Sequence, residues 1–444
     1  MRRVIGALIV CAVAGCDQTS ANADGELKFV VAAFRHGVRA PLADFAAHAN
    51  EHSGQPWPPT PQDWGAADWG ELTTRGAMIV SHLGEYYGTH YTAIWPAGMK
   101  AYLWADVDPR TKDTALALQA GMARQPRVEV TVEFRDGGTD PLYHPFKSAC
   151  GVPAAGELTR IAQALDRDDA SLVAKYQPEL GEIESTLACV APPPQGATCS
   201  PLSGVADVAT AWQPGQDRKS SPIDWKGRFS YASSASEAFV LEYANNMQAA
   251  WGRDAKLGEM LRLHELYFDR TEREPYLAKV NGSALLREIS DQLNRQAGGA
   301  TRGLCPRGNA SAQFVGLVGH DTNLASLNAL LGIGWKLDDV PGMGTGMSGF
   351  PANDALPAGA LVFELYRRGR TYSVRIEYVS VTPAQMKDGG GGQPFRIATT
   401  CNGVTPCDIP LESFNRLVAD ALGADNPFVT GCTADGKQVC LLRD

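Results

Sequence analysis

Three short, mostly apolar runs stand out in the hydrophobic pattern of this chain, and each one ends abruptly in polar residues. They cover residues 29–34, 99–106 and 313–319. Their lengths and their content of β-branched and aromatic residues are typical of buried strands in a parallel sheet. The segments that follow them are Arg35-His36-Gly37, Val107-Asp108-Pro109-Arg110 and His320-Asp321. Because ligands of open α/β sheets bind beyond the carboxyl ends of the strands, we expect these three junctions to meet at one functional edge.

The rest of the pattern adds helices and a hairpin. Helical periodicity covers residues 42–52, 72–87, 109–120, 324–331 and 411–422, and a hairpin is predicted from residues 360–366 and 371–379. The middle region is also helical, at residues 156–169, 233–251, 258–268 and 283–295. We therefore predict an α/β fold, with a mainly parallel sheet flanked by helices and an inserted, mostly helical second domain. The expected parts are residues 26–139 and 301–444 for the α/β domain and 140–300 for the inserted α domain.

The first junction holds candidate chemistry for a phosphorylated substrate. Arg35 and Arg39 flank His36, and a guanidinium offers forked donors that match phosphate oxygens. A neutral imidazole can take a phosphoryl group on a ring nitrogen, so His36 is the candidate nucleophile. Gly37 would let the backbone close around the anion.

The second junction places another cation at the start of a helix. Asp108 is a predicted N-cap and Pro109 a predicted first helical residue, so Arg110 falls in the first turn. Free backbone N–H groups in this turn favour a bound anion. The alternative is that Arg110 only pairs with Asp106 or Asp113, and the sequence leaves both open.

The third junction completes a predicted site for phosphoryl transfer. The three arginines and His320 would hold the phosphate oxygens, His36 would attack, and Asp321 would protonate the leaving group. Water would then release phosphate from the phosphohistidine, with Asp321 as base. A helix N-terminus lowers the pKa of Asp321 and a bound phosphate raises it. Because a general acid must be protonated, we expect the best activity on the acid side of neutrality.

Two residues of the helical region have competing interpretations. Glu237 could point into the pocket and bind the substrate. However, Ser234-Ala235-Ser236-Glu237 is also a capping box, in which the carboxylate only serves the end of a helix, and the local pattern favours this cap. His264 is interpreted as a core histidine rather than as a ligand.

A rival motif lies in the predicted helix after Pro41. His48-Ala49-Asn50-Glu51-His52 matches H-x-x-E-H, in which two imidazoles on one helix face bind zinc in a peptidase. The helical pattern ends at Ser53-Gly54, which leaves little helix to hold a metal rigidly. We therefore predict no metal site and keep a zinc peptidase only as an alternative.

The N-terminus predicts export. Residues 1–23 have the charged start and short apolar core of a signal peptide. Residues 13–16 resemble a bacterial lipoprotein cleavage site, which would make Cys16 a lipidated N-terminus. Ala21-Asn22-Ala23 fits ordinary signal cleavage, and we favour the lipoprotein. Both interpretations place the protein in the periplasm or at the cell envelope, with membrane anchoring only through Cys16.

The cysteines and the net charge agree with an exported enzyme. Of the 10 cysteines, Cys11 and Cys16 lie in the signal, and the even number that remains suggests disulfides. The local pairs Cys189/Cys199 and Cys401/Cys407 each bracket a plausible turn and are the two we predict. A formal net charge of −9 argues against a nucleic-acid partner, so an anionic substrate would need a local basic pocket.

The three junctions resemble the signature segments of the histidine acid phosphatases, with the closest likeness to the bacterial periplasmic phytase and glucose-1-phosphatase group. The segments are Arg35-His36-Gly37-Val38-Arg39-Ala40-Pro41, Ala105-Asp106-Val107-Asp108-Pro109-Arg110-Thr111 and Gly319-His320-Asp321-Thr322-Asn323-Leu324. The likeness spans about residues 26–370. It implies an α/β domain plus an α domain, a metal-free phosphohistidine mechanism without a cofactor, and the roles given above. It also implies that Glu237 lines the substrate pocket.

One departure from the family pattern bears on the substrate. Leu42-Ala43 stands where phytases of the group commonly have Thr-Lys, so fewer cations lie beside the pocket. We expect an exported acid phosphomonoesterase that acts on an inositol phosphate or a sugar phosphate, and efficient phytate hydrolysis is in doubt. A relative that binds phosphate esters without turnover is an alternative. A phosphoglycerate mutase-like transferase is another, although export, cysteines and the large insert speak against it. The preferred ester and the oligomeric state stay open.

Overall fold

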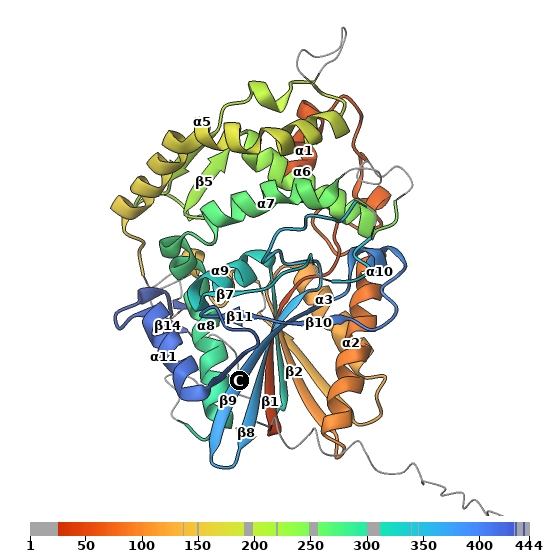
Figure 1. Cartoon of the computed structure of the whole chain (residues 1–444), viewed down its shortest axis with the longest axis vertical. Helices are drawn as coiled ribbons and strands as arrows, with labels where there is room; N and C mark the ends of the chain where they lie inside the picture. The colour runs from red at the N-terminus through yellow and green to blue at the C-terminus, as the bar shows by residue number, and fades with distance from the viewer. Residues whose placement is uncertain are drawn as a thin grey trace, which may run out of the picture.

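A mixed sheet forms the lower half of the molecule (Figure 1). The computed structural model describes residues 25–135, 137–148, 151–190, 199–218, 221–247, 256–299, 311–338, 340–344, 346–429, 431–432 and 438–439. Within them the strand order is β10-β9-β8-β1-β6-β2-β3, and β12 pairs with β9. The strands are β1 (Glu26–Arg35), β2 (Met99–Ala105), β3 (Val128–Phe134), β6 (Phe314–Gly319), β8 (Ala360–Arg368), β9 (Thr371–Ser380), β10 (Phe395–Ala398) and β12 (Cys407–Pro410).

The strands that carry the predicted junctions lie next to one another. β6 lies between β1 and β2 and is parallel to both, with Arg35 opposite Gly319 at the end of the β1–β6 pair. Residues 29–34 of β1 are buried, as a continuous apolar run predicts for a strand covered on both faces. β8 continues the sheet on the other side of β1 in an antiparallel pairing. The predicted α/β class, with its mainly parallel sheet and flanking helices, is confirmed.

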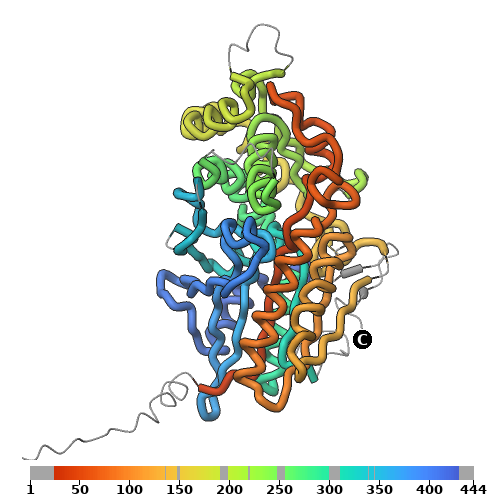
Figure 2. The backbone as a smooth tube through the Cα atoms, turned by 90° about the vertical axis from the view of Figure 1, so that its right-hand side faces the viewer, coloured from red at the N-terminus to blue at the C-terminus, as the bar shows by residue number. Residues whose placement is uncertain are grey.

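Helices cover both faces of the sheet. On one face, α2 (Thr74–Ile94) and α3 (Pro109–Met122) lie side by side (Figure 2). Their apolar residues share a core with β1 and β2. They approach closely because Gly84 and Gly121 carry no Cβ, which would collide with the backbone of the facing helix. On the other face, α8 (Pro275–Gln296), α9 (Asp321–Leu331) and α11 (Leu411–Leu422) pack against one another.

A second, mostly helical lobe lies above the sheet in Figure 1. It contains α5 (Ala155–Thr186), α6 (Arg228–Ala244), α7 (Leu257–Thr271), the 3₁₀ helix η3 (Leu202–Gly204) and the pair β4 (Val208–Ala211) and β5 (Ile223–Lys226). The predicted helix at residues 42–52 also lies in this lobe. It is an α-helix only over α1 (Ala43–His48) and continues as the 3₁₀ helix η1 (Ala49–His52).

Short elements complete the described chain. They are η2 (Pro61–Trp64), α4 (Pro145–Ser148), β7 (Ile333–Gly334), α10 (Pro383–Lys387), β11 (Thr400–Cys401), η5 (Pro427–Val429), β13 (Gly431–Cys432) and β14 (Gln438–Val439).

The helical lobe does not coincide with residues 140–300. α8 lies inside that range, but it packs beside the sheet against α9, α11 and β1. α1 and η1 precede the range, yet the Tyr231 hydroxyl of α6 donates to the Ala49 carbonyl of η1. We therefore propose domain boundaries that assign α8 to the α/β part and α1 with η1 to the helical lobe.

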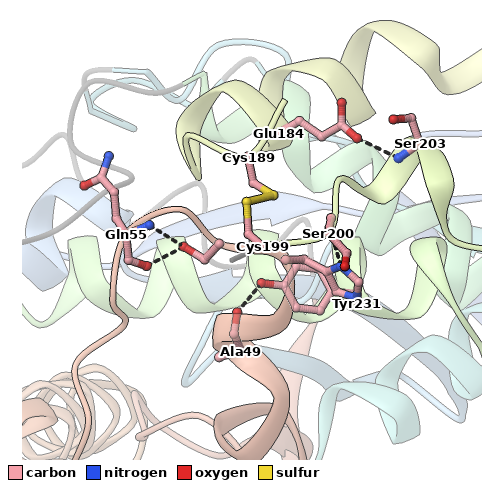
Figure 3. Close-up of a disulfide and its surroundings, with 10 residues drawn as sticks. Ala49, Gln55, Glu184, Cys189, Cys199, Ser200, Ser203 and Tyr231 are labelled. Atoms are coloured by element: carbon pink, nitrogen blue, oxygen red, sulfur yellow. Dashed lines mark hydrogen bonds between the residues drawn. A yellow bond between two sulfur atoms is a disulfide. The ribbon is translucent and has the colours of Figure 1, made fainter. Parts of the chain in front are cut away.

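A disulfide and nearby hydrogen bonds join the segments of the lobe (Figure 3). Cys189, just after α5, is bonded to Cys199, and the next residue, Ser200, donates its N–H to the Glu51 carbonyl at 2.8 Å. The second predicted pair, Cys401–Cys407, is also present. Both disulfide predictions are therefore confirmed, and the side chains of Cys150, Cys305, Cys432 and Cys440 lie outside the described part.

The predicted export signal, with Cys16, also lies outside the described residues. Among the described helices, none combines the length and the apolar character that crossing a membrane requires.

Candidate active site

The predicted junctions meet at the carboxyl edge of β1, β6 and β2. The His36 N–H donates to the Gly319 carbonyl and the Asp106 N–H donates to the Val318 carbonyl, both at 3.0 Å. The chain that leaves β1 and the chain that leaves β2 are thus held against the end of β6. The rings of His36 and His320 lie edge to face with centroids 5.7 Å apart.

His36 has the state that a nucleophile needs. Burial and the guanidiniums of Arg110, Arg39 and Arg35 hold the pKa of His36 well below its ordinary value, so the imidazole is neutral. Its Nδ1 lies 2.9 Å from the Gly37 carbonyl oxygen. Because a carbonyl only accepts, Nδ1 carries the proton and Nε2 keeps its lone pair.

Two carboxylates form ion pairs with the arginines of this site. Arg35 Nη2 contacts Glu237 Oε1 and lies 2.9 Å from Asp321 Oδ2. Arg39 Nη2 lies 2.9 Å from Glu237 Oε2. The Arg35 and Arg39 side chains are only 3% and 6% exposed, so these ion pairs are shielded from water. The structure thus brings Glu237 and Asp321 to one shared guanidinium group, that of Arg35.

The capping interpretation of Glu237 is wrong. α6 begins at Arg228, so Ser234 and Glu237 lie inside the helix and not at its end. Burial alone would raise the pKa of Glu237, but Arg39 and Arg35 outweigh burial and lower it. Glu237 is therefore an ionised residue of the pocket.

Arg110 reaches the site from the first turn of α3, as predicted. Its Nη2 lies 2.6 Å from Asp108 Oδ2 and 3.3 Å from His320 Nδ1. Asp108 occupies the N-cap position, but its side chain makes no capping hydrogen bond. The partner of Arg110 is thus Asp108, and not Asp106 or Asp113 as the alternative supposed.

His320 is held by a pair of residues that the sequence does not reveal. Its Nε2 lies 2.7 Å from Asp106 Oδ2, and His144 Nε2 lies 2.8 Å from the same oxygen. Asp106 is fully buried. Because the three residues come from separate segments, no spacing connects them. The one available signal is that Asp106 is the last residue of a predicted strand.

Asp321 is the first residue of α9, which begins three residues before the helix predicted at residues 324–331. Burial alone would raise the pKa of Asp321, but the charge of Arg35 outweighs burial and holds this pKa well below the ordinary value. The predicted lowering is therefore present, and the ion pair with Arg35 is a main source of it. The ring of His36 lies beside that of His320, the residue before Asp321, and Asp321 pairs with Arg35, the residue before His36, so the candidate acid and the candidate nucleophile come from adjoining segments.

Two small cavities lie beside the arginines in the described part of the chain. A cavity of about 10 Å³ lies between Arg35 and Glu237, and another of about 20 Å³ lies between Arg39 and Glu237. Each volume accommodates about one water molecule. A phosphate that binds to both guanidiniums must therefore displace a carboxylate.

The other histidine predictions have different outcomes. His264 is buried and its Nδ1 lies 3.0 Å from Ser233 Oγ, as expected for a core histidine. In the H-x-x-E-H segment, His48 Nδ1 lies 2.7 Å from Glu51, whereas His52 Nδ1 faces the Ser200 carbonyl at 2.6 Å. Among the described residues these side chains form no group that could hold a metal ion. The zinc peptidase alternative therefore has no metal site among the described residues of this segment.

Sequence comparisons find relatives that match most of the length of this chain. A sequence model of the histidine phosphatase superfamily (branch 2) matches residues 26–145 and 225–379. Phytase AppA of Escherichia coli (strain K12) is 29% identical over 396 residues, which cover 83% of this chain and 84% of that protein. Glucose-1-phosphatase of Salmonella typhimurium (strain LT2) is 24% identical over 391 residues, which cover 82% and 83%.

Solved structures agree with the sequence comparisons. Hafnia alvei phytase in complex with tartrate has a TM-score of 0.74 and 26% identity, over 90% of this chain and 98% of that one. The same enzyme in complex with myo-inositol hexakis sulphate gives a TM-score of 0.73 over the same shares, also at 26% identity. This chain therefore belongs to the histidine acid phosphatase family, branch 2 of the histidine phosphatase superfamily, and is a phosphomonoesterase.

Proposed function

We propose that this phosphatase transfers the phosphoryl group of its substrate to Nε2 of His36. The observation that carries the proposal is the state of this imidazole, which is neutral, donates Nδ1–H to the Gly37 carbonyl and lies among three guanidiniums. Three guanidiniums suit a phosphate dianion and the negative charge that its oxygens keep in the transition state. Attack by Nε2 forms the N–P bond while the bond from phosphorus to the substrate oxygen breaks.

We propose that Arg35, Arg39, Arg110 and His320 bind the phosphate oxygens. The phosphate then takes the place of Glu237 on Arg35 and Arg39. A displaced Glu237 carboxylate still lies beside the substrate and can accept a hydrogen bond from a hydroxyl group of the leaving alcohol. Through this hydrogen bond Glu237 would have the substrate-binding role that the family resemblance implies.

Asp321 is the proposed acid for the leaving oxygen and the base for the later attack of water. In the free site Arg35 stabilises the Asp321 carboxylate. A bound phosphate competes for Arg35 and adds negative charge nearby, and both effects raise the pKa of Asp321. Because the first step needs the protonated carboxyl group, we expect the rate to fall as the pH rises, which makes the enzyme an acid phosphatase.

The proposed substrate is a sugar phosphate or an inositol phosphate. Beyond Arg39, the cavity wall contains Pro41, Leu42 and Phe45, which offer no cation for a second phosphate group. We therefore expect glucose-1-phosphate to be a better substrate than phytate. Export to the periplasm or the cell envelope is part of the proposal, supported by the two disulfides and the leader sequence.

A substrate panel tests the proposal. Phytate, glucose-1-phosphate and p-nitrophenyl phosphate are compared on the parent enzyme and on His36→Ala. We expect turnover of the monoesters by the parent and a loss of at least about 10³-fold in the variant, because the nucleophile is gone. A variant that keeps its rate would show that His36 is misassigned. Binding of the esters by the parent without turnover would favour the alternative of a non-catalytic relative.

A further inference from the structure

Four side chains of the kinds that bind metals converge near the carboxyl ends of β2 and β6. Asp106, Asp108, His144 and His320 each offer one atom, and these atoms all lie within 4.8 Å of one another. The Nε2 atoms of His144 and His320 lie 2.8 and 2.7 Å from the same oxygen, Oδ2 of Asp106. His320 Nε2 also lies 3.6 Å from Asp108 Oδ2.

Fixed backbone segments hold these side chains in place. The Asp106 N–H is bonded to the end of β6, and the His320 N–H donates to Asn323 Oδ1 at 2.9 Å. The N–H of His144 donates to the Asp140 carbonyl at 2.9 Å. Backbone hydrogen bonds therefore hold three of the four residues, Asp106, His144 and His320, which lowers the entropy cost of binding an ion.

Asp106 supplies a second, independent observation. Its side chain is fully buried, and its Oδ1 has no hydrogen-bond partner among the described residues. A buried carboxylate oxygen without a partner is costly, and a cation bound to the carboxylate would compensate for this cost. The side chains of His144 and Asp108 are 21% and 32% exposed, so an ion can reach the group from solvent.

We propose that Asp106, Asp108, His144 and His320 form a binding site for a divalent transition-metal ion of the zinc class. Zinc takes four imidazole and carboxylate ligands at about 2.0–2.2 Å, and two imidazoles disfavour magnesium and calcium, which prefer oxygen ligands. The ion would replace the Nε2 protons that the two histidines now share with Asp106. This inference does not depend on the phosphatase mechanism proposed above.

The bound ion would adjoin the phosphate pocket, because His320 belongs to both sites. Its Nε2 faces the cluster and its Nδ1 faces Arg110. The competing explanation is that His144 serves only as a hydrogen-bond donor that keeps Asp106, and through it His320, in place. The two explanations differ in whether His144 must be able to bind a metal.

The variant His144→Gln separates them, because a glutamine amide can still donate to Asp106 but is a poor ligand for zinc. The tag-free, chelator-treated chain is titrated with Zn²⁺ by calorimetry, and with Co²⁺ by the visible absorption that tetrahedral coordination produces. We expect one equivalent to bind to the parent, and an affinity at least about tenfold lower in His144→Gln. The matched control is His48→Gln, which removes an exposed histidine that also pairs with a carboxylate, and its affinity should equal that of the parent.

Two results would overturn the proposal. One is a parent that binds no Zn²⁺ at millimolar concentration. The other is a His144→Gln variant that binds as tightly as the parent. Thermal unfolding of each variant in the absence of metal confirms that the compared proteins are folded.

Discussion

At the level of single residues, the pocket already holds anions of its own. Glu237 binds Arg35 and Arg39, and Asp321 binds Arg35, where a phosphate would bind. The affinity for phosphate is therefore the difference between two sets of ion pairs, because the arginines exchange one anionic partner for another. Buried ion pairs of this kind are costly to break when nothing replaces them. Substrate binding must supply that replacement.

This competition predicts the effect of Glu237→Gln on product binding. Removing the charge weakens the internal competitor, so inorganic phosphate should inhibit the variant at a concentration several-fold lower than the parent, roughly 3- to 10-fold for about 1 kcal/mol. The measurement is the competitive inhibition constant of phosphate. The control is Glu259→Gln, which changes an exposed carboxylate that pairs with Lys256 outside the site. Weaker inhibition of Glu237→Gln would mean that the carboxylate assists phosphate binding.

A second residue-level prediction concerns Asp321→Asn. An asparagine cannot donate a proton to the leaving oxygen, so the loss should depend on the leaving group. We expect kcat for glucose-1-phosphate to fall by about 10²- to 10⁴-fold and kcat for p-nitrophenyl phosphate to fall far less, because nitrophenolate leaves without a proton. Equal losses for both substrates would argue against Asp321 as the acid.

The residues that the sequence reveals and those that it hides differ in a physical way. His36, Arg110 and Asp321 each follow a recognisable buried strand, so their common edge could be predicted. His144 comes from a loop and reaches Asp106 only through the tertiary fold. Glu237 matches a local capping pattern, and only the true start of α6 shows that the pattern is accidental.

At the level of elements, the predicted carboxyl ends of β1, β2 and β6 lie within one residue of the observed ends. Continuous apolar runs made β1, β2 and β6 predictable. β3 went unpredicted because it is an edge strand with alternating exposed and half-buried residues, which gives a weaker signal. The sequence also does not predict the close approach of α2 and α3, since a glycine within a helix does not by itself indicate a contact with another helix.

That contact predicts that Gly121→Ala destabilises the protein. A Cβ on Gly121 would collide with the backbone of α2, and overpacking of this kind costs about 1–3 kcal/mol. The measurement is the urea midpoint of unfolding. The control is Gly181→Ala in α5, where a Cβ would meet no atom within 4 Å and helix propensity favours alanine. If both variants unfold at the same midpoint, the α2–α3 contact is looser than described.

At the level of the whole molecule, two segments that are far apart in sequence build the lobe over the site. The sequence predicts a contiguous insert, because nothing in residues 42–52 indicates that they leave the sheet. The structure instead packs Phe45 against Tyr231 of α6. The disulfide Cys189–Cys199 lies next to this junction, since Ser200 is bonded to Glu51. We therefore expect this disulfide both to stabilise the lobe and to help to hold α6, which carries Glu237, in position.

We predict that removing this disulfide affects both stability and substrate binding. A crosslink between cysteines 10 residues apart stabilises a fold by about 3 kcal/mol in the chain-entropy estimate. The double variant Cys189→Ser/Cys199→Ser should lose about that much and show a raised KM for glucose-1-phosphate. The control Cys401→Ser/Cys407→Ser removes a disulfide beside the sheet, so it should lose stability without a change in KM. A KM that responds equally in both would contradict the connection.

The central claim is that a phosphoryl group passes through His36, and trapping it is the most direct test. The enzyme is mixed with phosphate-labelled substrate and quenched in alkali within one turnover, and the labelled peptide is identified by mass spectrometry. We predict an acid-labile phosphohistidine at residue 36 in the parent, no label in His36→Ala, and a longer-lived label in Asp321→Asn with p-nitrophenyl phosphate, because the base for water is missing. Normal turnover with no labelled histidine, or a label on another residue, would contradict the account.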